Sequence, residues 1–409
     1  TFKEMKEKKV VFLSYDGITD PLGQSQILPY LFGISSNKNY KITIVSFEKT
    51  KNYHQNKVFI LNKLKKNNID WVQLKYTKYP PIFSTLWDIY KLKRTLNKLK
   101  NKGLDLIHCR SYITNLVALE FKKTYKTPFI FDMRGFYADE RVEGKIWSLD
   151  NFIYKKIYNY FKSKEKEFLQ FSDYTISLTE NGKKEILSWN LPNQTKIKVI
   201  PCCTDENLFQ TKNIQNVRAE LGYNKDDFII SYVGSIGTWY MLDEMLDFFK
   251  CLKTKKPNAK FFFITKDDSQ LILEKVKSKK IDISSIKIKP SSREMIPSYI
   301  GASNFSIFFI LPVFSKKASS PTKMGEIMNL GIPIICNSGV GDVDEIMEKS
   351  MPELLVKEFS NKEYERVIDL ITNNYKPNQK TIIETSHSYY SLEKGVEKYK
   401  EVYQEILGE

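Results

Sequence analysis

Short apolar runs alternate with longer amphipathic segments along the first half of the chain. The runs predict strands at 10–14, 42–47, 71–74, 105–108, 128–132 and 174–178. Apolar residues at helical spacing predict intervening helices at 25–35, around 59–64, and at 87–99, 113–125 and 151–171. Strands that alternate with helices of this length favour an α/β fold with a doubly wound parallel sheet.

The same alternation starts again after the polar segment 211–216. It predicts strands at 228–233, 260–265, 286–289, 305–310 and 332–336, and helices at 239–252, 268–279, 293–301 and 321–331. The pattern therefore predicts two Rossmann-like domains with parallel sheets, residues 1–195 and 196–388. We expect a last helix, within 389–409, to pack back on the first domain.

The loop after the predicted strand 305–310 has the chemistry of a phosphate site. Ser319 and Ser320 are suited to cap the next helix, and Pro321 to its first turn. The free N–H groups and the positive end of the helix dipole would hold an anion. Three lysines flank them: Lys316, Lys317 and Lys323. One turn later, Glu326 can accept hydrogen bonds from two sugar hydroxyls, which suggests a nucleotide. A plain strand–helix unit with solvated lysines is the alternative.

Further charged residues follow other predicted strands. In open parallel sheets, ligands bind beyond the carboxyl ends of the strands, so these ends would line one cleft if the two domains face each other. The arginines are Arg110, Arg134 and Arg141, and the carboxylates are Asp16, Asp132, Asp139 and Glu140. Arginines suit a diphosphate, and carboxylates suit sugar hydroxyls or a general base. A surface ion pair explains each arginine alone, and His108 is either a core or a catalytic histidine.

Composition limits the class of protein. The 409 residues suggest two domains, and a hydrophobic content of 42% is enough for sizeable cores. No run of 18 apolar residues predicts a membrane span, and the segment 10–13 predicts a first strand, not a signal peptide. Five cysteines without a framework spacing favour reduced thiols in the cytoplasm. Cys and His residues do not cluster at metal-ligand spacing, so we expect no metal site.

The net charge is 64 − 48 = +16, which favours anionic partners. Codon bias of an AT-rich genome explains the lysine excess equally well. The predicted helix 151–171 has lysines opposite an apolar face. This helix either lies on an anionic membrane surface or packs on the sheet as an ordinary amphipathic helix.

Five segments occur in the order typical of one family. They are 14–31 with a Gly loop and helix, 105–111 (DLIHCRS), 199–209 (VIPCCTDENLF), 232–237 (YVGSIG), and 321–326 with 331–335 (PTKMGE, GIPII). Together they resemble the large bacterial family of retaining glycosyltransferases with the GT-B fold, of the surface-polysaccharide type. The resemblance covers nearly the whole chain and implies two facing Rossmann-like domains.

The resemblance implies roles for individual residues. Glu326 matches the second glutamate of the family's Glu-x7-Glu motif, which binds the donor ribose. Backbone N–H groups of Ser319, Ser320 and Thr322 would hold the diphosphate. Gly23 would let the first loop approach the donor, and Gly234 lies at the second Gly turn.

This sequence also departs from the family. The first glutamate of the motif falls on Ala318, the phosphate-binding arginine falls on Ser235, and the second histidine of the strand exit falls on Arg110. The family's lysine after the Gly turn is not evident in 237–242. The candidates for the missing cations are Lys316, Lys323, Arg110 and Arg134.

We therefore predict a hexosyltransferase that moves a sugar from a UDP- or GDP-linked donor, with retention, to a lipid-linked or polysaccharide acceptor in cell-surface glycan synthesis. Asp16, Arg110, Asp132 and Arg134 are the predicted catalytic residues. The enzyme would need no metal or other cofactor, and would work in the cytoplasm or peripherally on the inner membrane face. Nucleic acid is not a predicted partner. A nucleotide-sugar epimerase on the same fold and a non-catalytic basic binding protein are the alternatives.

Overall fold

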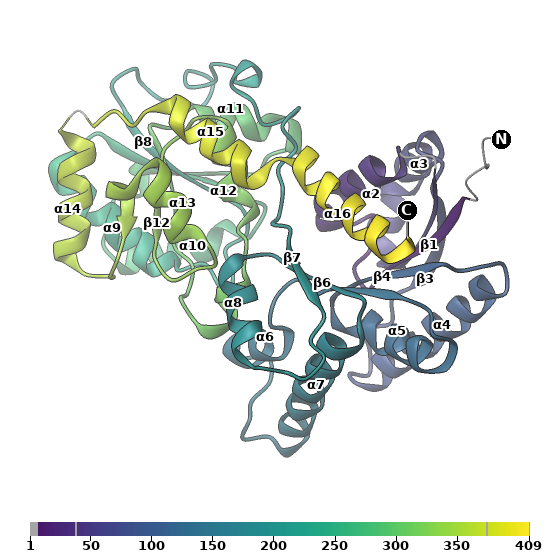
Figure 1. Ribbon diagram of the computed structural model, residues 1–409. Coiled ribbons are helices and arrows are strands. Elements are labelled where there is room, and N and C mark those ends of the chain that lie inside the picture. Colours follow the sequence, from purple (N-terminus) through teal and green to yellow (C-terminus); the bar gives the residue numbers. More distant parts are fainter. Residues whose placement is uncertain (1–6, 37–38, 374, 409) are drawn as a thin grey trace. The chain divides into compact units, whose positions relative to one another are not determined.

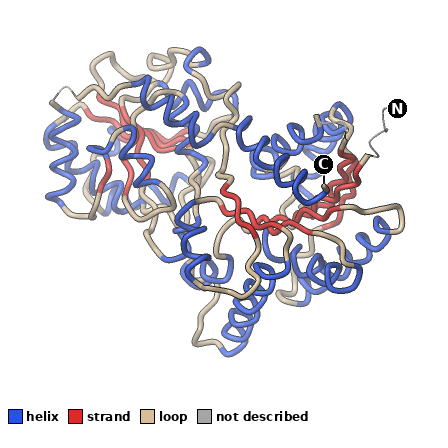
Figure 2. The backbone as a smooth tube through the Cα atoms, viewed as in Figure 1, coloured by secondary structure: helices blue, strands red, loops and turns tan. Residues whose placement is uncertain are grey.

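A computed structural model describes residues 7–36, 39–373 and 375–408. The chain divides into two units, Thr1–Pro201 with Leu392–Glu409, and Cys202–Ser391. Each unit contains one sheet of parallel strands covered by helices (Figures 1 and 2). The prediction of two α/β domains with parallel sheets is confirmed, and the cleft between them stays a prediction.

Seven parallel strands form the sheet of the first unit, in the order β3-β2-β1-β4-β5-β6-β7. They are β1 Lys8–Ser14, β2 Tyr40–Glu48, β3 Asp70–Lys75, β4 Leu106–Arg110, β5 Phe129–Asp132, β6 Tyr174–Ser177 and β7 Lys196–Val199. The central strand β1 is buried from Val10 to Ser14, because helices cover both faces of a doubly wound sheet. Leu13 lies opposite Cys109 in the register of β1 with β4.

Nine α-helices accompany this sheet in the described residues. They are α1 Pro21–Gln26, α2 Leu28–Ser35, α3 Thr50–Lys66, α4 Phe83–Lys100, α5 Ser111–Tyr125, α6 Tyr137–Glu143, α7 Phe152–Phe171, α8 Glu180–Ser188 and α16 Leu392–Leu407. In Figure 1, α2, α3 and α16 lie on one face of the sheet, and α4, α5 and α7 on the other. The last helix packs on α2 of the first unit, as the pattern predicted, and the rings of Tyr30 and Tyr399 meet there at 5.5 Å.

The second unit has six parallel strands in the order β10-β9-β8-β11-β12-β13. They are β8 Phe228–Val233, β9 Ala259–Ile264, β10 Ile286–Lys289, β11 Phe305–Phe308, β12 Ile334–Asn337 and β13 Leu355–Val356. The described helices are α9 Leu242–Lys255, α10 Ser269–Ser278, α11 Ile296–Gly301, α12 Thr322–Asn329, α13 Val343–Ser350, α14 Asn361–Thr372 and α15 Gln379–Tyr390. The strands are rich in Phe and Ile, and their side chains form the core of this unit.

Both sheets reverse their strand order beside their first strand. The reversal falls between β1 and β4 in the first unit, and between β8 and β11 in the second. The connections after these strands leave toward opposite faces, so a crevice opens beyond their carboxyl ends. The residues after these four strands are therefore the first place to look for a site.

Several predicted bounds were wrong. The first unit ends at Pro201 and not at residue 195, because Lys196–Val199 pairs with β6 as the edge strand β7. No helix was predicted at 137–143, where the structure has α6, and α5 starts at Ser111, directly after Arg110, and not at 113. The stretch from 342 to 388, which we had not assigned, contains α13, β13, α14 and α15.

Candidate active site

The start of α12 lies beyond the strand-order reversal of the second unit. Pro321 is its N-cap residue, and no side chain in the described residues caps it. The prediction that Ser319 and Ser320 cap this helix was wrong. Ser320 Oγ instead accepts a hydrogen bond from the backbone N–H of Cys202, at 3.2 Å, and residues Phe314–Ala318 form a turn of 3-10 helix before it. The first turn of α12 thus keeps its positive dipole end without an acidic neighbour.

Lys323, in the first turn of α12, is buried and not outward-facing as we expected. Its Nζ donates a hydrogen bond to Tyr232 Oη at 3.0 Å. The same nitrogen lies 4.1 Å from the ring centroid of Tyr232 and 3.5 Å from that of Tyr240. Burial lowers the pKa of Lys323 well below its usual range, and Glu326 offsets this only in part. A cation held against aromatic rings has little anionic compensation, so an incoming anion would find it available.

Gly234 makes room for this lysine at the end of β8. Its φ is +120°, and a Cβ atom there would lie 2.9 Å from Lys323 Nζ. Tyr232 links the two elements, because its hydroxyl donates to the carbonyl of Ser235 at 2.5 Å. Lys323 therefore brings a cation from α12 to the Gly turn after β8. Ser235 itself is exposed at this turn.

Glu326 lies one turn further along α12 and is buried. Its Oε1 accepts a hydrogen bond from Nη2 of Arg293 at 3.0 Å. Burial raises the pKa of Glu326 above its usual range, although Arg293 and Lys323 favour the carboxylate. Arg293 follows β10, and its guanidinium carbon lies 5.1 Å from the ring centroid of Phe209. Arg293 was not among the predicted site residues, because no motif or spacing in the sequence distinguishes it from other arginines in loops.

Two other predicted residues of this loop are also buried. Lys316 has its Nζ 3.7 Å from the ring centroid of Trp239, and its carbonyl accepts from the N–H of Gly341 at 2.8 Å. Ala318, which stands where the family has a glutamate, is buried as well. Thr322, the first residue of α12, is half-buried. The loop 314–321 is thus a largely packed segment, which does not fit the alternative of a solvated lysine cluster.

In the first unit, an ion pair spans the strand-order reversal. Asp16 follows β1, Arg110 ends β4, and Arg110 Nε lies 3.5 Å from Asp16 Oδ2. Arg110 is buried, whereas the side chain of Asp16 is 48% exposed. Ser111, the next residue, has a φ of +66°, and such backbone conformations concentrate at functional positions. The structure therefore brings these two predicted catalytic residues together.

Asp132 ends β5 and is completely enclosed. Tyr399 of α16 donates a hydrogen bond to Asp132 Oδ2 at 3.0 Å. His108 Nε2 lies 3.6 Å from the same oxygen, and Arg134 Nη1 lies 3.7 Å from Oδ1. Burial alone would raise the pKa of Asp132, but Arg134, His108 and Arg110 together lower it to about 2. A carboxylate this acidic is a weak proton acceptor, so Asp132 is better suited to positioning Arg134 than to acting as a base.

His108 belongs to the same enclosed group. Its Nδ1 lies 2.8 Å from Tyr403 Oη of α16, and burial lowers its pKa, although Asp132 opposes the shift. Neither His108 Nε2 nor Asp132 Oδ1 has a hydrogen bond in the described residues. A cavity of about 10 Å³ lies beside them, lined also by Tyr30, and it has room for about one water molecule. The core alternative for His108 is therefore the one this geometry favours.

The sequence comparisons identify both units. Residues 36–208 match Glycosyltransferase Family 4, and residues 213–387 match Glycosyl transferases group 1. The chain combines two glycosyltransferase domains. The search of curated proteins found no match to this sequence. Neither matching family describes an epimerase or a simple binding protein, so these two alternatives are not favoured.

Solved structures share the fold of the whole chain at low sequence identity. A sucrose-phosphate synthase from Thermosynechococcus elongatus is 15% identical with a TM-score of 0.75, over 98% of this chain and 99% of that one. Anabaena HepE, solved in complex with UDP-glucose, is 12% identical with a TM-score of 0.69, over 97% and 99%. The lipopolysaccharide outer core galactosyltransferase WaaB is 12% identical with a TM-score of 0.66, again over 97% and 99%. These structures establish the GT-B fold for this chain.

Other candidate residues of the glycosyltransferase have structural partners. Asp139 accepts hydrogen bonds from Tyr158 Oη at 2.9 Å and from Lys162 Nζ at 2.8 Å, so it is less suited to be the general base. Gly23 packs against the first loop, and a Cβ there would lie 2.3 Å from the carbonyl oxygen of Gly17. Close packing against this loop therefore requires glycine at 23, and an approach of the loop to the donor stays a prediction.

Glu48, which the sequence analysis missed, holds the first loop of the glycosyltransferase in place. It lies at the end of β2 and is buried. Its Oε1 accepts from the N–H of Ile18 at 2.9 Å, and its Oε2 accepts from the N–H of Thr19 at 3.2 Å. A carboxylate with several such donors fixes the backbone that leads from Asp16 into α1.

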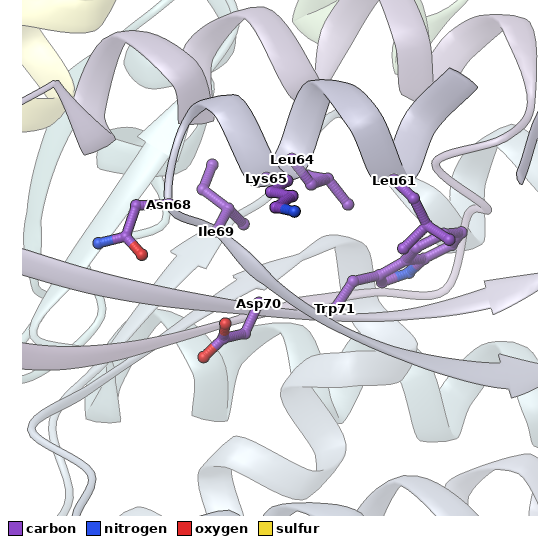
Figure 3. Close-up of a pocket in the computed structure, with 7 residues that line it drawn as sticks. All are labelled: Leu61, Leu64, Lys65, Asn68, Ile69, Asp70 and Trp71. Carbon is purple, nitrogen blue, oxygen red and sulfur yellow. The ribbon is translucent and has the colours of Figure 1, made fainter. Parts of the chain in front are cut away.

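The first domain also has an open hollow of about 300 Å³ between α3 and β3. Figure 3 shows Leu61 and Trp71 at one end of it and Asn68 and Asp70 at the other. The hollow lies where β3 begins, away from the carboxyl ends of the strands. We therefore place the candidate site of the glycosyltransferase at the strand ends and not in this hollow.

Proposed function

We propose that the chain transfers a sugar from a nucleoside-diphosphate donor, with retention, to a lipid-linked or polysaccharide acceptor. The second domain would hold the donor, with the diphosphate at the start of α12 and the ribose hydroxyls on Glu326. The observation that carries this proposal is the position of Lys323, whose Nζ lies at the Gly234 turn beneath the uncapped start of α12. The complexes of HepE with UDP and UDP-glucose support a donor of this class.

Lys323 would replace the family arginine that is absent at Ser235. The departing diphosphate gains negative charge as the bond to the sugar breaks, and fixed cations lower the energy of that state. The helix dipole of α12 and the buried ammonium of Lys323 both favour this charge. In this proposal, Lys323 and the start of α12 stabilise the departing diphosphate, and no metal or cofactor takes part.

The first domain would serve the acceptor. Asp16 is the exposed carboxylate among the candidates, and Arg110 orients it. Arg134, which has a φ of +61° and lies beside Asp132, supplies a second cation at the same sheet edge. The name of WaaB, a lipopolysaccharide outer core galactosyltransferase, supports a surface glycan as acceptor and a hexose as the transferred sugar. We place the enzyme in the cytoplasm, peripherally on the inner membrane face.

A thermal-shift screen tests the donor class. UDP, GDP, CDP and their common sugars are added singly to the full-length chain. We expect UDP or GDP and one of its sugars to raise the melting temperature, since a ligand at 100 times its Kd stabilises by about 2.7 kcal/mol. The sugar that binds is then incubated with the enzyme, with and without a glycan acceptor, and NMR reports the anomeric configuration of the product. An epimer formed without acceptor, or no response to any nucleotide, would contradict the proposal.

A further inference from the structure

The first two turns of α4 expose their apolar side chains and bury their polar ones. Phe83 is 71% exposed and Trp87 is 54% exposed, whereas Asp88 is 0% exposed. Leu86 and Tyr90 are exposed as well, and Ser84 is buried. The second half of the helix is ordinary, because Leu92 and Leu96 are buried. This inversion leaves an apolar face without a partner in the described part of the chain.

Buried polar contacts fix the helix in this orientation. Asp88 accepts hydrogen bonds from Tyr15 Oη at 3.0 Å and from the N–H of Thr77 at 3.1 Å. It also pairs with Lys91 at 2.7 Å. Rotating the helix to bury its aromatic residues would break these contacts, and removing the partners of a buried charged group is costly. The apolar face is therefore held toward solvent by the fold.

The exposed residues form one patch, the α4 patch: Tyr79, Ile82, Phe83, Leu86, Trp87 and Tyr90. Four of the six lie on α4 at helical spacing, and two lie in the turn before it. The rings of Trp87 and Tyr90 stack with centroids 5.3 Å apart. Contiguous apolar surface of this kind marks a site of interaction.

The surroundings of the α4 patch are strongly basic. Between residues 75 and 104 the only acidic residue is Asp88, which is buried. The basic residues are Lys75, Lys78, Lys91, Lys93, Arg94, Lys98, Lys100 and Lys102. Two of them are compensated, Lys91 by Asp88 and Lys93 by Glu120 of α5. A large positive excess therefore surrounds the apolar residues.

We propose that the α4 patch inserts into the headgroup region of an anionic lipid bilayer. Trp and Tyr prefer the boundary between lipid and water, and lysines around them attract acidic headgroups while their stems cover apolar surface. A second copy of this chain fits less well, because a two-fold contact through this patch would oppose the same excess of cations. No helix in the described residues has the length and apolar composition that a membrane span requires.

This proposal for the α4 patch rests on the proposed function, in which the acceptor is lipid-linked. The experiment that tests it needs neither donor nor acceptor. Tyr15, whose hydroxyl bonds Asp88, lies next to the candidate residue Asp16. The α4 patch is thus anchored to the first loop, beside the proposed acceptor side of the first domain. Transferase activity and membrane binding can therefore fail separately.

Vesicle sedimentation of the 409-residue chain tests whether the α4 patch binds anionic lipid. The wild type is expected to bind vesicles that contain phosphatidylglycerol and to bind phosphatidylcholine vesicles less. The double variant Phe83→Ser with Trp87→Ser should bind the anionic vesicles about tenfold more weakly. The matched control is Val58→Ser with Phe59→Ser on α3, where two similarly exposed apolar residues lie on the other face of the sheet. This control should bind as the wild type does.

A charge variant keeps the test independent of the aromatic substitutions. Lys78→Glu with Arg94→Glu changes two exposed side chains and should weaken binding to anionic vesicles, with no change in melting temperature. The proposal is overturned if the wild type does not bind, if the α4 variants bind normally, or if the loss follows the α3 pair instead. A wild type that is dimeric in solution and becomes monomeric in the Phe83 and Trp87 variant would also overturn it, in favour of contact between copies.

Discussion

Both sheets have charged side chains beyond the carboxyl ends of their strands, yet they compensate these charges differently. In the first domain, Asp132 is surrounded by Arg134, His108 and Tyr399, and its pKa falls to about 2. In the second domain, Lys323 is surrounded by aromatic rings, and burial lowers its pKa. Several counter-charges surround Asp132, whereas Glu326 compensates the buried Lys323 only in part.

This difference indicates which of the two sheets has a site suited to an anion beyond its strand ends. A saturated ion pair network mainly stabilises the fold and gains little from a ligand. A buried lysine that its neighbouring carboxylate compensates only in part is costly to keep protonated until an anion arrives. The second domain therefore has the features expected of an anion site, whereas Asp16, Arg110 and Arg134 follow or end the strands of the first domain.

The largest expected effect concerns Lys323. We expect Lys323→Met to lower the turnover number by about 100-fold or more, which is typical for loss of one group that stabilises a leaving anion. Methionine has a similar length and suits the aromatic surroundings, so the melting temperature should not fall. Steady-state transfer of the donor identified in the screen measures this effect.

Lys317→Met is the matched control for this substitution. Lys317 is an exposed lysine of the same loop, and its loss should change turnover little. Equal losses in both variants would show that the general positive charge of the loop matters and that the specific position of Lys323 does not. Full activity of Lys323→Met would remove this residue from the diphosphate site.

A smaller effect is expected for the saturated group of the first domain. The pKa of Asp132 falls from 3.8 to about 2 on folding, which corresponds to about 2 kcal/mol of stability. This contribution is present at pH values above 3.8 and is lost as the pH falls toward 2. His108 acts in the same direction, because its lowered pKa means that the unfolded chain binds the proton more readily below about pH 6.5.

Asp132→Asn should therefore destabilise the first domain by about 2 kcal/mol at neutral pH, and by about half as much near pH 3. Urea unfolding at both pH values, followed by tyrosine and tryptophan fluorescence, measures the difference. An unchanged midpoint at neutral pH would mean that Asp132 is not stabilised by its cations. The comparison between a saturated and an open group would then fail.

Hydrophobic periodicity was sufficient to predict most of the fold. The runs at 10–14 and 228–233 are apolar because both faces of a central parallel strand are covered. The hydrophobic periodicity also marks a helix that we did not predict. Tyr364, Val367, Ile368 and Ile371 are buried at the spacing of α14. On α7, Phe161 and Phe168 are buried as predicted, but Ile153 and Tyr160 are exposed, because periodicity does not tell how far a neighbouring element extends.

The site was less predictable, because its geometry depends on contacts between distant segments. Tyr399 and Tyr403 reach Asp132 and His108 across 267 and 295 residues of sequence. The role of Ser320 changed from a cap to an acceptor for Cys202 because the chain preceding α12 folds into a 3-10 turn. Glu326 and Lys323 were selected correctly as neighbours on one helix, since helical spacing is local information.

Titration calorimetry with the nucleotide from the screen tests the central claim most directly. It compares the wild type with Glu326→Ala in the second domain and Asp16→Ala in the first. If α12 holds the donor, Glu326→Ala should weaken nucleotide binding by about tenfold or more, as loss of a hydrogen bond to a charged group does, while Asp16→Ala binds as the wild type does. Normal binding by Glu326→Ala together with weakened binding by Asp16→Ala would contradict the claim.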